Sequence, residues 1–531
     1  MHYLAENYTM SGLLKFSMKK TALVIIFCSL TSIYAFSQSN QLLHSAKPNI
    51  VLFLVDDMGW QDCSVPFWNQ VTPFNKIYHT PNMQRLADEG MKFTNAYATP
   101  VCTPTRTSFM SGMNVTHHGI SSWTSPNKNN NTDELDDQMS PAEWNLNGLS
   151  PVPGIEKTMY ATTFPSLLKK DGYFTIHVGK AHWASMGTPG TDPKNLGFIV
   201  NVAGHAGGHP QSYLGEDNYG NITGKTQPQA VPDLESYFGS ATFLTEALTK
   251  EALNALETPI ENKQPFFLSM AHYAIHVPIM ADKRFVQKYY DAGMDSTEAK
   301  YAALIEGMDK SLGDLMDYLK QKKVDQNTII IFMSDNGGLG LVPPRRGVAQ
   351  TQNLPLKAGK GSVYEGGIRE PMIVKWPGVV KPKSIANQYV IAEDFFPTIL
   401  EMAKVKNYKT VQTIDGKSFM PSLKNEKYSD TTRELIWHMP NKWISKDGPG
   451  INYYSAIRKG QWKMIYSMRT GKKELYNLVE DIGEQQDISN AYPQKVKQLS
   501  NILSNQLRRW NTPMPYFRAT NKKVPLPDEL F

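Results

Sequence analysis

Two apolar segments that each end in polar side chains most constrain the fold of this chain. Residues 48–55 read Pro-Asn-Ile-Val-Leu-Phe-Leu-Val and lead into two aspartates, and residues 328–333 read Thr-Ile-Ile-Ile-Phe-Met and lead into Ser-Asp-Asn-Gly-Gly. Continuous apolar runs of this length are typical of strands buried on both faces of a parallel sheet. Ligands bind at the carboxyl ends of such strands, so we predict that the two polar clusters meet at one functional edge.

Helical and strand patterns alternate along the first four-fifths of the chain. Between Tyr301 and Leu319 the apolar residues fall at helical spacing, and residues 163–170 and 392–404 also indicate helices, whereas 384–391 indicates a strand. Regions 124–157 and 185–235 are rich in loop-forming residues and predict long loops that shape a pocket. This alternation predicts an α/β domain over residues 46–420.

Beyond residue 420 the pattern changes. Short aromatic strands are expected at 435–438, 453–458, 462–466 and 474–478, followed by a helix over 494–510. These segments predict a small α+β subdomain over residues 421–531, with an antiparallel sheet and one helix.

The N-terminus indicates export. Lys19 and Lys20 precede the apolar run 21–35, which is shorter than a bilayer span and is followed by small residues. We therefore predict a signal peptide in residues 1–37, with an upstream extension, no stable membrane insertion, and a periplasmic, secreted or cell-surface protein. Removing this segment lowers the formal net charge from +6 to about +4, a weak basic excess that fits an anionic substrate and does not indicate nucleic-acid binding.

The run Cys102-Thr-Pro-Thr-Arg106 places a thiol four residues before a guanidinium. If Pro104 opens a helix, both side chains share one face and point into one pocket. Cys102 could instead be a buried structural cysteine. A Cys63–Cys102 disulfide is a further alternative, and it would preclude chemistry at Cys102.

Further groups follow the predicted strands. Asp56, Asp57, Asp335 and Asn336 together offer the oxygen ligands that a hard cation such as Ca²⁺ prefers, although an Asp-Asp pair is more often a solvated turn. Other polar residues expected at the same edge are Lys180 and His182 in Gly-Lys-Ala-His, His276 in His-Val-Pro, and Lys360 and Arg369 around a glycine-rich loop.

In this order the motifs resemble the type I, formylglycine-dependent sulfatases of the alkaline-phosphatase-like superfamily. The resemblance rests on Asp-Asp, C-x-P-x-R, G-K-x-H, H-x-P, S-D-N-G and G-K-G-x-x-Y-E-G-G-x-R-x-P, and it covers essentially the whole mature chain. It implies a large, mixed, mostly parallel sheet flanked by helices, plus a small C-terminal subdomain. It also implies sulfate ester hydrolysis.

The resemblance implies roles for individual residues. A maturation enzyme would convert Cys102 to formylglycine, whose hydrate attacks sulfur, and Asp56, Asp57, Asp335, Asn336 and the matured Cys102 would bind Ca²⁺. Arg106 would hold the hydrate, Lys180, His276 and Lys360 would bind the sulfate, His276 or Lys360 would protonate the leaving oxygen, and His182 would help to expel sulfate.

The expected substrate is a sulfated saccharide. The stretch from Gly204 to Pro210 resembles bacterial polysaccharide sulfatases, so His205, His209 and Arg369 are candidate substrate contacts, and Trp123 and Trp144 could stack on sugar rings. Algal polysaccharides such as ulvan or carrageenan and animal glycosaminoglycans remain open. The alternatives are a phosphodiesterase or phosphonate hydrolase of the same superfamily, and a non-catalytic protein that binds sulfated glycans.

Overall fold

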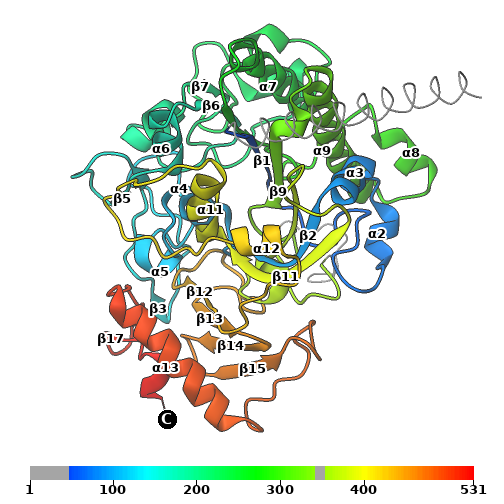
Figure 1. Cartoon of the computed structure of the whole chain (residues 1–531). Helices are drawn as coiled ribbons and strands as arrows, with labels where there is room; N and C mark the ends of the chain where they lie inside the picture. The colour runs from blue at the N-terminus through cyan, green and yellow to red at the C-terminus, as the bar shows by residue number, and fades with distance from the viewer. Residues whose placement is uncertain (1–46, 341–352, 531) are drawn as a thin grey trace, which may run out of the picture. The chain divides into compact units, whose positions relative to one another are not determined.

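The computed structural model describes residues 47–340 and 353–530. Within it, residues 48–530 belong to one compact unit that contains both predicted lobes (Figure 1). No helix of these two ranges is both long and apolar enough to cross a bilayer. The predicted signal peptide, residues 1–37, lies outside the described residues.

An eight-stranded mixed sheet forms the centre of the main lobe, in the order β11-β2-β10-β9-β1-β8-β6-β7. Only β10 of these strands runs antiparallel to its neighbours. The predicted mixed, mostly parallel sheet is confirmed. Its strands are β1 (Asn49–Val55), β2 (Met91–Tyr97), β6 (Phe174–Gly179), β7 (Val200–Val202), β8 (Phe266–Ala271), β9 (Thr328–Ser334), β10 (Arg369–Lys375) and β11 (Ser384–Ile391).

Helices cover both faces of this sheet because its central strands are apolar on both sides. In β1, Val51 and Phe53 pack into one core and Ile50 and Leu52 into the other. The first core is closed by α3 (Pro81–Glu89), α7 (Leu244–Glu261), α8 (Val286–Asp291) and α9 (Ser296–Gln321). The second is closed by α4 (Cys102–Ser111), α6 (Phe164–Lys170), α11 (Phe395–Met402) and α12 (Met420–Lys424).

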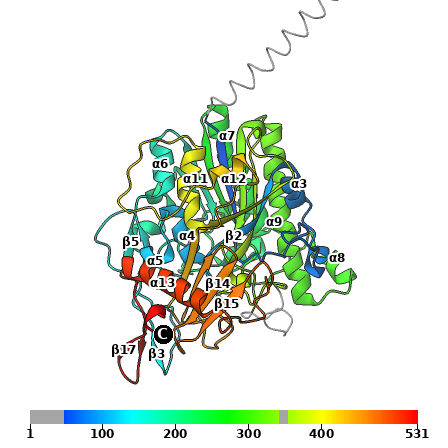
Figure 2. The same cartoon turned by 60° about the horizontal axis from the view of Figure 1, so that its bottom comes forward.

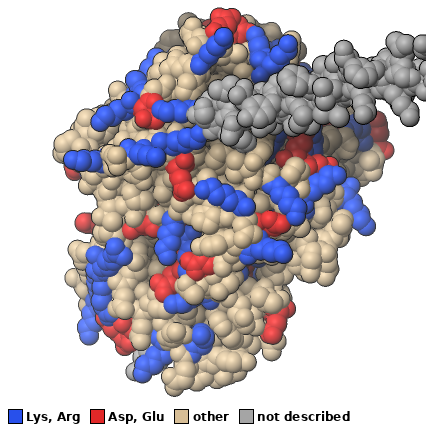
Figure 3. All heavy atoms as spheres, viewed as in Figure 1, with Lys and Arg blue, Asp and Glu red and all other residues tan. Residues whose placement is uncertain are grey.

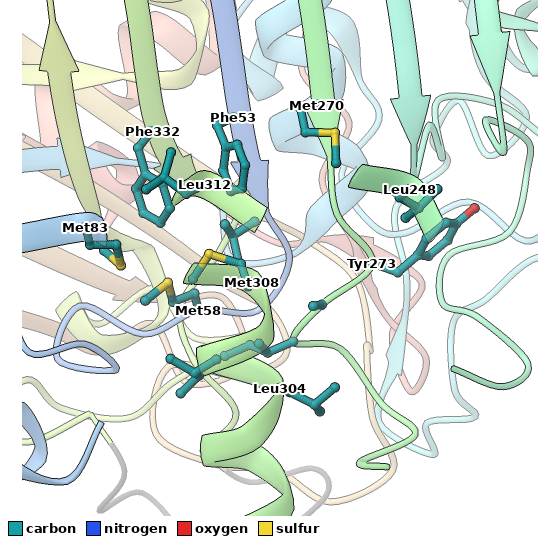
Figure 4. Close-up of a cluster of buried hydrophobic side chains, with 14 of the residues drawn as sticks. Phe53, Met58, Met83, Leu248, Met270, Tyr273, Leu304, Met308, Leu312 and Phe332 are labelled. Carbon is teal, nitrogen blue, oxygen red and sulfur yellow. The ribbon is translucent and has the colours of Figure 1, made fainter. Parts of the chain in front are cut away.

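Figure 4 shows how the first core is filled. Leu304, Met308 and Leu312 lie on α9, and Leu312 and Met308 lie nearest to Phe53 and Phe332 of the sheet. These α9 residues recur at intervals of four, which places them on one face of the helix. The methionines there fill the core, as the helical spacing predicts.

The second lobe contains a four-stranded antiparallel sheet, again as predicted. Its strands are β12 (Glu434–Met439), β13 (Tyr454–Lys459), β14 (Trp462–Ser467) and β15 (Lys473–Asn477). Helix α13 (Pro493–Arg509) lies across this sheet in Figure 2 and buries Leu499 and Leu503 against it.

The predicted loop regions contain short elements that periodicity did not indicate. β7 extends the main sheet at its edge, and three residues are too few to show a strand period. β3 (Met139–Ser140) and β4 (Gly148–Ser150) also lie in these regions. The other short α-helices and β-strands of the described residues lie elsewhere: α2 (Pro73–Ile77), α5 (Val115–His118), β5 (Thr158–Tyr160), α10 (Glu365–Ile368), β16 (Tyr516–Phe517) and β17 (Lys522–Lys523).

A buried ionic network joins the two lobes. The Nζ of Lys463 in β14 lies 2.9 Å from Glu365 Oε1 and 2.8 Å from Glu484 Oε1, and all three side chains are fully buried. Glu484 Oε2 accepts from the Glu365 backbone N–H at 2.7 Å, and its carbonyl accepts from Lys357 Nζ at 3.0 Å. The second lobe therefore fixes the loop that carries Lys360.

Lys463→Met should lower the free energy of unfolding by about 3–5 kcal/mol, because two buried carboxylates lose their shared cation. Denaturant titration followed by circular dichroism measures this change. Lys459→Met removes the exposed pair with Glu434 and should cost less than about 1 kcal/mol. Equal effects of the two substitutions would contradict the assigned role of the network.

Candidate active site

The two polar clusters predicted from the sequence meet at the carboxyl ends of neighbouring strands. β1 and β9 pair in parallel with Val55 beside Ser334, so Asp56 and Asp57 lie next to Asp335 and Asn336. Asn336 Nδ2 donates to Asp57 Oδ1 at 2.8 Å. All four side chains are fully buried, which excludes a solvated turn at the Asp-Asp pair.

This cluster retains oxygen atoms with no protein partner. Asp56 Oδ1 and Asn336 Oδ1 are buried and accept no hydrogen bond from the described residues, and such buried acceptors ordinarily have a partner. Burial, followed by the nearby charge of Asp335, raises the pKa of Asp56 well above its ordinary value. Buried carboxylate and amide oxygens form the donor set of a hard divalent cation, so these residues fit one.

Three basic side chains balance the three carboxylates. Lys180 Nζ lies 2.6 Å from Asp56 Oδ2, and Lys360 Nζ lies 2.6 Å from Asp57 Oδ1. Arg106 Nε lies 2.7 Å from Asp335 Oδ2. Because three basic groups face the three carboxyl groups, a bound divalent cation would add positive charge and make the site attractive to an anion.

Arg106 also carries a buried nitrogen without a hydrogen-bond partner. Its Nη1 donates to the Lys180 carbonyl at 2.7 Å, while Nη2 has no partner among the described residues. An unpaired guanidinium nitrogen beside the carboxylate cluster can donate to an anionic or hydroxylated group on Cys102.

Cys102 is the first residue of α4, with Arg106 one turn later on the same face. Cys102 and Cys63 are both free thiols, so the structure excludes the disulfide alternative. Burial raises the pKa of the Cys102 thiol. Unmodified Cys102 is therefore protonated near neutral pH and is a poor nucleophile.

His182 faces Cys102 with an unprotonated nitrogen. Its Nε2 lies 2.8 Å from the Thr124 carbonyl, which can only accept, so Nε2 carries the proton. Its Nδ1 lies 3.4 Å from Cys102 Sγ. Burial, followed by the charge of Lys180, holds the pKa of His182 well below its ordinary value, so the ring is a neutral base.

His276 and Lys360 form a second pair. His276 Nδ1 donates to the Val277 carbonyl at 3.1 Å, and its Nε2 accepts from Lys360 Nζ at 2.9 Å. Burial lowers the pKa of His276. Burial also opposes the charge on Lys360, but the neighbouring carboxylates, Asp57 first, outweigh it and raise the pKa of this amine. The pair thus holds its proton on Lys360.

A cavity of about 290 Å³ opens beside these groups. Cys102, His182, His276 and Lys360 form its reactive part, and the ring of His209 stacks on His276 at 5.6 Å. Its other lining residues are Val101, Trp123, Gly208, Val277, Leu339, Trp443 and Ile444. Trp443 and Ile444 were not predicted, because they follow β12 in the second lobe and carry no motif.

Two predicted substrate contacts do not line the cavity. Arg369 lies within β10, where its Nη2 donates to the Thr94 carbonyl at 2.6 Å and to Asn95 at 2.9 Å, and its guanidinium covers the Trp60 ring. Arg369 therefore stabilises the strand pairing, and its contact with substrate stays a prediction. The Nη1 of Arg369 also donates to Glu365 Oε2 in the glycine-rich loop at 3.2 Å.

His205 and Trp144 also make contacts within the protein and do not line the cavity. The carbonyl of His205 accepts from the backbone N–H of His182 at 3.0 Å. The ring Nδ1 of His205 accepts from the backbone N–H of Gly207 at 3.2 Å. Trp144 packs against Ile120 and Leu146. The stretch from Gly204 to Pro210 thus supports His182: a Cβ on Gly208 would lie 2.6 Å from the His182 ring. Of the two predicted histidines, only His209 lines the cavity.

Comparisons with known proteins identify the family of this chain. The profile of the family described as Sulfatase matches residues 48–405. The chain belongs to the sulfatase family. The resemblance seen in the sequence is confirmed, and so is the activity that it implied, hydrolysis of sulfuric esters. A second profile, N-sulphoglucosamine sulphohydrolase, C-terminal, matches residues 359–512.

Relatives cover nearly the whole sulfatase chain. A sulfatase of Formosa agariphila is 29% identical over 96% of this chain and 98% of its own length. The N-acetylgalactosamine-6-sulfatase of Mus musculus is 31% identical over 84% of this chain and 76% of its own. The crystal structure of Ps i-CgsB aligns with a TM-score of 0.67 and 27% identity over 88% of this chain and 94% of that one.

Proposed function

We propose that this sulfatase removes sulfate from a sulfated saccharide, using Cys102 in its formylglycine form together with Ca²⁺. The observation that carries this proposal is the cavity in which Cys102, His182, His276 and Lys360 converge beside a buried carboxylate cluster. A hydrated formylglycine would supply the geminal hydroxyls that act as nucleophile, and Ca²⁺ would supply a Lewis acid for the sulfate oxygens.

The cation would be held by Asp56, Asp57, Asp335 and Asn336, with the matured Cys102 as a further ligand. Asp56 Oδ1 and Asn336 Oδ1 are the buried oxygens without a partner. His276 lies at the edge of this cluster, with Nε2 3.5 Å from Asp57 Oδ2. Once the carboxylates are neutralised by a cation, the charges of Lys180 and Lys360 become available to a sulfate ester.

The chain's own residues divide the proton transfers between two sides of the cavity. Lys360 carries a proton towards the cavity while His276 accepts from it, so this pair is the acid for the leaving oxygen. His182 presents its bare Nδ1 to position 102, so it is the base there. Arg106 Nη2 is the donor free to orient the group at position 102.

A saccharide substrate is supported by the relatives and by the cavity. The mouse relative bears the name N-acetylgalactosamine-6-sulfatase, and Ps i-CgsB has been crystallised in complex with k-i-k-neocarrahexaose. Tryptophans line the cavity of this chain, as is common where sugars bind.

Lys and Arg alternate with Asp and Glu on the surface seen in Figure 3, so this face carries no continuous basic field. We further propose export of the protein and maturation by a formylglycine-generating enzyme.

Sulfate release from a panel of esters tests the function. Protein coexpressed with a maturation enzyme should release sulfate from at least one of N-acetylgalactosamine 6-sulfate, glucosamine 6-sulfate and sulfated carrageenan oligosaccharides. Its kcat/KM for bis(p-nitrophenyl) phosphate should be lower by at least about 100-fold, because a phosphodiester carries a second organic substituent where a sulfate monoester has only terminal oxygens. Faster phosphodiester hydrolysis, or no sulfate release by protein with verified formylglycine, would contradict the proposal.

A further inference from the structure

One wall of the cavity comes from the second lobe. Trp443 lies in the segment between β12 and β13 and lines the same cavity as Cys102 and Lys360. Its ring rests on the backbone of Gly361, where a Cβ would come within 1.9 Å of the ring. Gly361 directly follows Lys360 and has φ of +86°, so glycine permits both the turn and the close approach.

The segment holds Trp443 in a fixed position. Asn452 Oδ1 accepts from the backbone N–H of Trp443 at 2.8 Å and of Ile444 at 3.3 Å, and Asn452 Nδ2 donates to the Ile444 carbonyl at 2.9 Å. Asn452 is buried, whereas the Trp443 side chain is only half-buried. A half-buried tryptophan on a fixed backbone presents a rigid apolar surface to the cavity.

Trp123 lines the cavity from the side of His182. The neighbouring Thr124 carbonyl accepts from His182 Nε2, and this loop is tied to the segment that carries Trp443. The backbone N–H of Glu134 donates to the Lys442 carbonyl at 2.8 Å, and Asn441 Nδ2 donates to Asp133 at 3.2 Å. The two tryptophans therefore belong to one continuous rim, built jointly by the two lobes.

The size of the cavity fits a single ring. About 290 Å³ lies at the small end of the roughly 300–1,000 Å³ typical of small-molecule pockets. Because the reactive groups would bind the sulfate, the apolar wall is available to contact the sugar ring. A pyranose presents a flat face of C–H groups, which packs well on an indole ring.

We propose that Trp443 is a specificity-determining residue, on which the terminal sulfated pyranose stacks, so that the second lobe selects the saccharide. This inference rests on the proposed saccharide sulfatase function and deepens it. The sulfate itself is bound elsewhere, by Lys180, His276 and Lys360. Substitution of Trp443 should therefore weaken binding of the saccharide but not of inorganic sulfate.

Binding calorimetry in a Cys102→Ala background separates the two contributions without catalysis. The probes are inorganic sulfate, N-acetylgalactosamine 6-sulfate and a monosulfated neocarrabiose, each in the presence of Ca²⁺. Trp443→Ala should raise the Kd of the preferred saccharide at least about 10-fold and leave the Kd of sulfate within about twofold. Trp443→Phe should recover most of the lost affinity, because it restores an aromatic face.

Trp462→Ala is the matched control, since Trp462 is a half-buried tryptophan of the same lobe that packs on Tyr492. It should leave both affinities unchanged. In the catalytically competent protein, Trp443→Ala should raise KM for the saccharide more than it lowers kcat. Equal loss of sulfate and saccharide binding, unchanged saccharide binding, or no saccharide binding by protein that binds sulfate would each overturn the inference, and none of these results would refute sulfate ester hydrolysis.

Discussion

Protein carrying Cys102→Ala should release no detectable sulfate from any ester that the wild type hydrolyses, a loss of at least about 10⁴-fold in kcat. Position 102 lies at the N-terminal end of α4, with His182 Nδ1 at 3.4 Å and Arg106 on the same helical face. Burial raises the pKa of the Cys102 thiol, so activity should also follow the fraction of Cys102 converted to formylglycine. Ion chromatography of sulfate and mass spectrometry of the peptide containing residue 102 measure the two quantities.

Cys63→Ala is the matched control for this prediction. Cys63 is likewise a buried free thiol, but it donates to the Val65 carbonyl at 3.2 Å and does not line the cavity. Its substitution should leave kcat within about twofold and lower stability modestly. Substantial activity in Cys102→Ala protein, or full activity in protein whose Cys102 is unmodified, would rule out the assigned nucleophile.

Chelation of divalent cations should lower kcat/KM by about 10³-fold and lower Tm by several degrees, and added Ca²⁺ should restore both. Loss of a Lewis acid removes several kcal/mol of transition-state stabilisation, and loss of a ligand specific for the folded state removes stability in proportion to its binding. The protein should remain folded without the cation, because Lys180, Lys360 and Arg106 each pair with one carboxylate. Differential scanning calorimetry with and without Ca²⁺ gives a measurement independent of activity.

Asp56→Asn should abolish the increase in Tm that Ca²⁺ produces, since Asp56 Oδ1 is one of the buried oxygens without a partner. Asp430→Asn is the control, because Asp430 is only partly buried and accepts a hydrogen bond from the neighbouring Thr432. It should preserve both the Ca²⁺-induced shift and the activity. A chelated enzyme with full activity, or an unchanged Ca²⁺ response in Asp56→Asn protein, would show that this cluster holds no catalytic cation.

Much of the site was predictable because its residues follow buried strands. Asp56 and Asp335 each come directly after a buried strand, and parallel strands bring their carboxyl ends to one edge. The i, i+4 relation of Cys102 and Arg106 likewise follows from helix geometry alone. Local periodicity thus decided which side chains could meet.

The side-chain positions that the sequence did not indicate depend on packing between distant segments. Arg369 follows a glycine-rich loop in the sequence, yet its strand register turns it towards Thr94 and Asn95. Trp443 has no motif, and only the close contact of its ring with Gly361 reveals its place. Neither arrangement is indicated by a motif or a periodicity in the local sequence.

The sequence by itself determined the central strands β1 and β9, the covering helix α9 and the order of the motifs, because the free energy of burying apolar side chains acts through the periods of strand and helix. β11 spans residues 384–391 in both the prediction and the structure. Only the tertiary structure decided the protonation pattern and the shape of the cavity. His182 and Lys360 owe their proton positions to partners from other segments, and the wall formed by Trp443 exists only where the second lobe packs on the first.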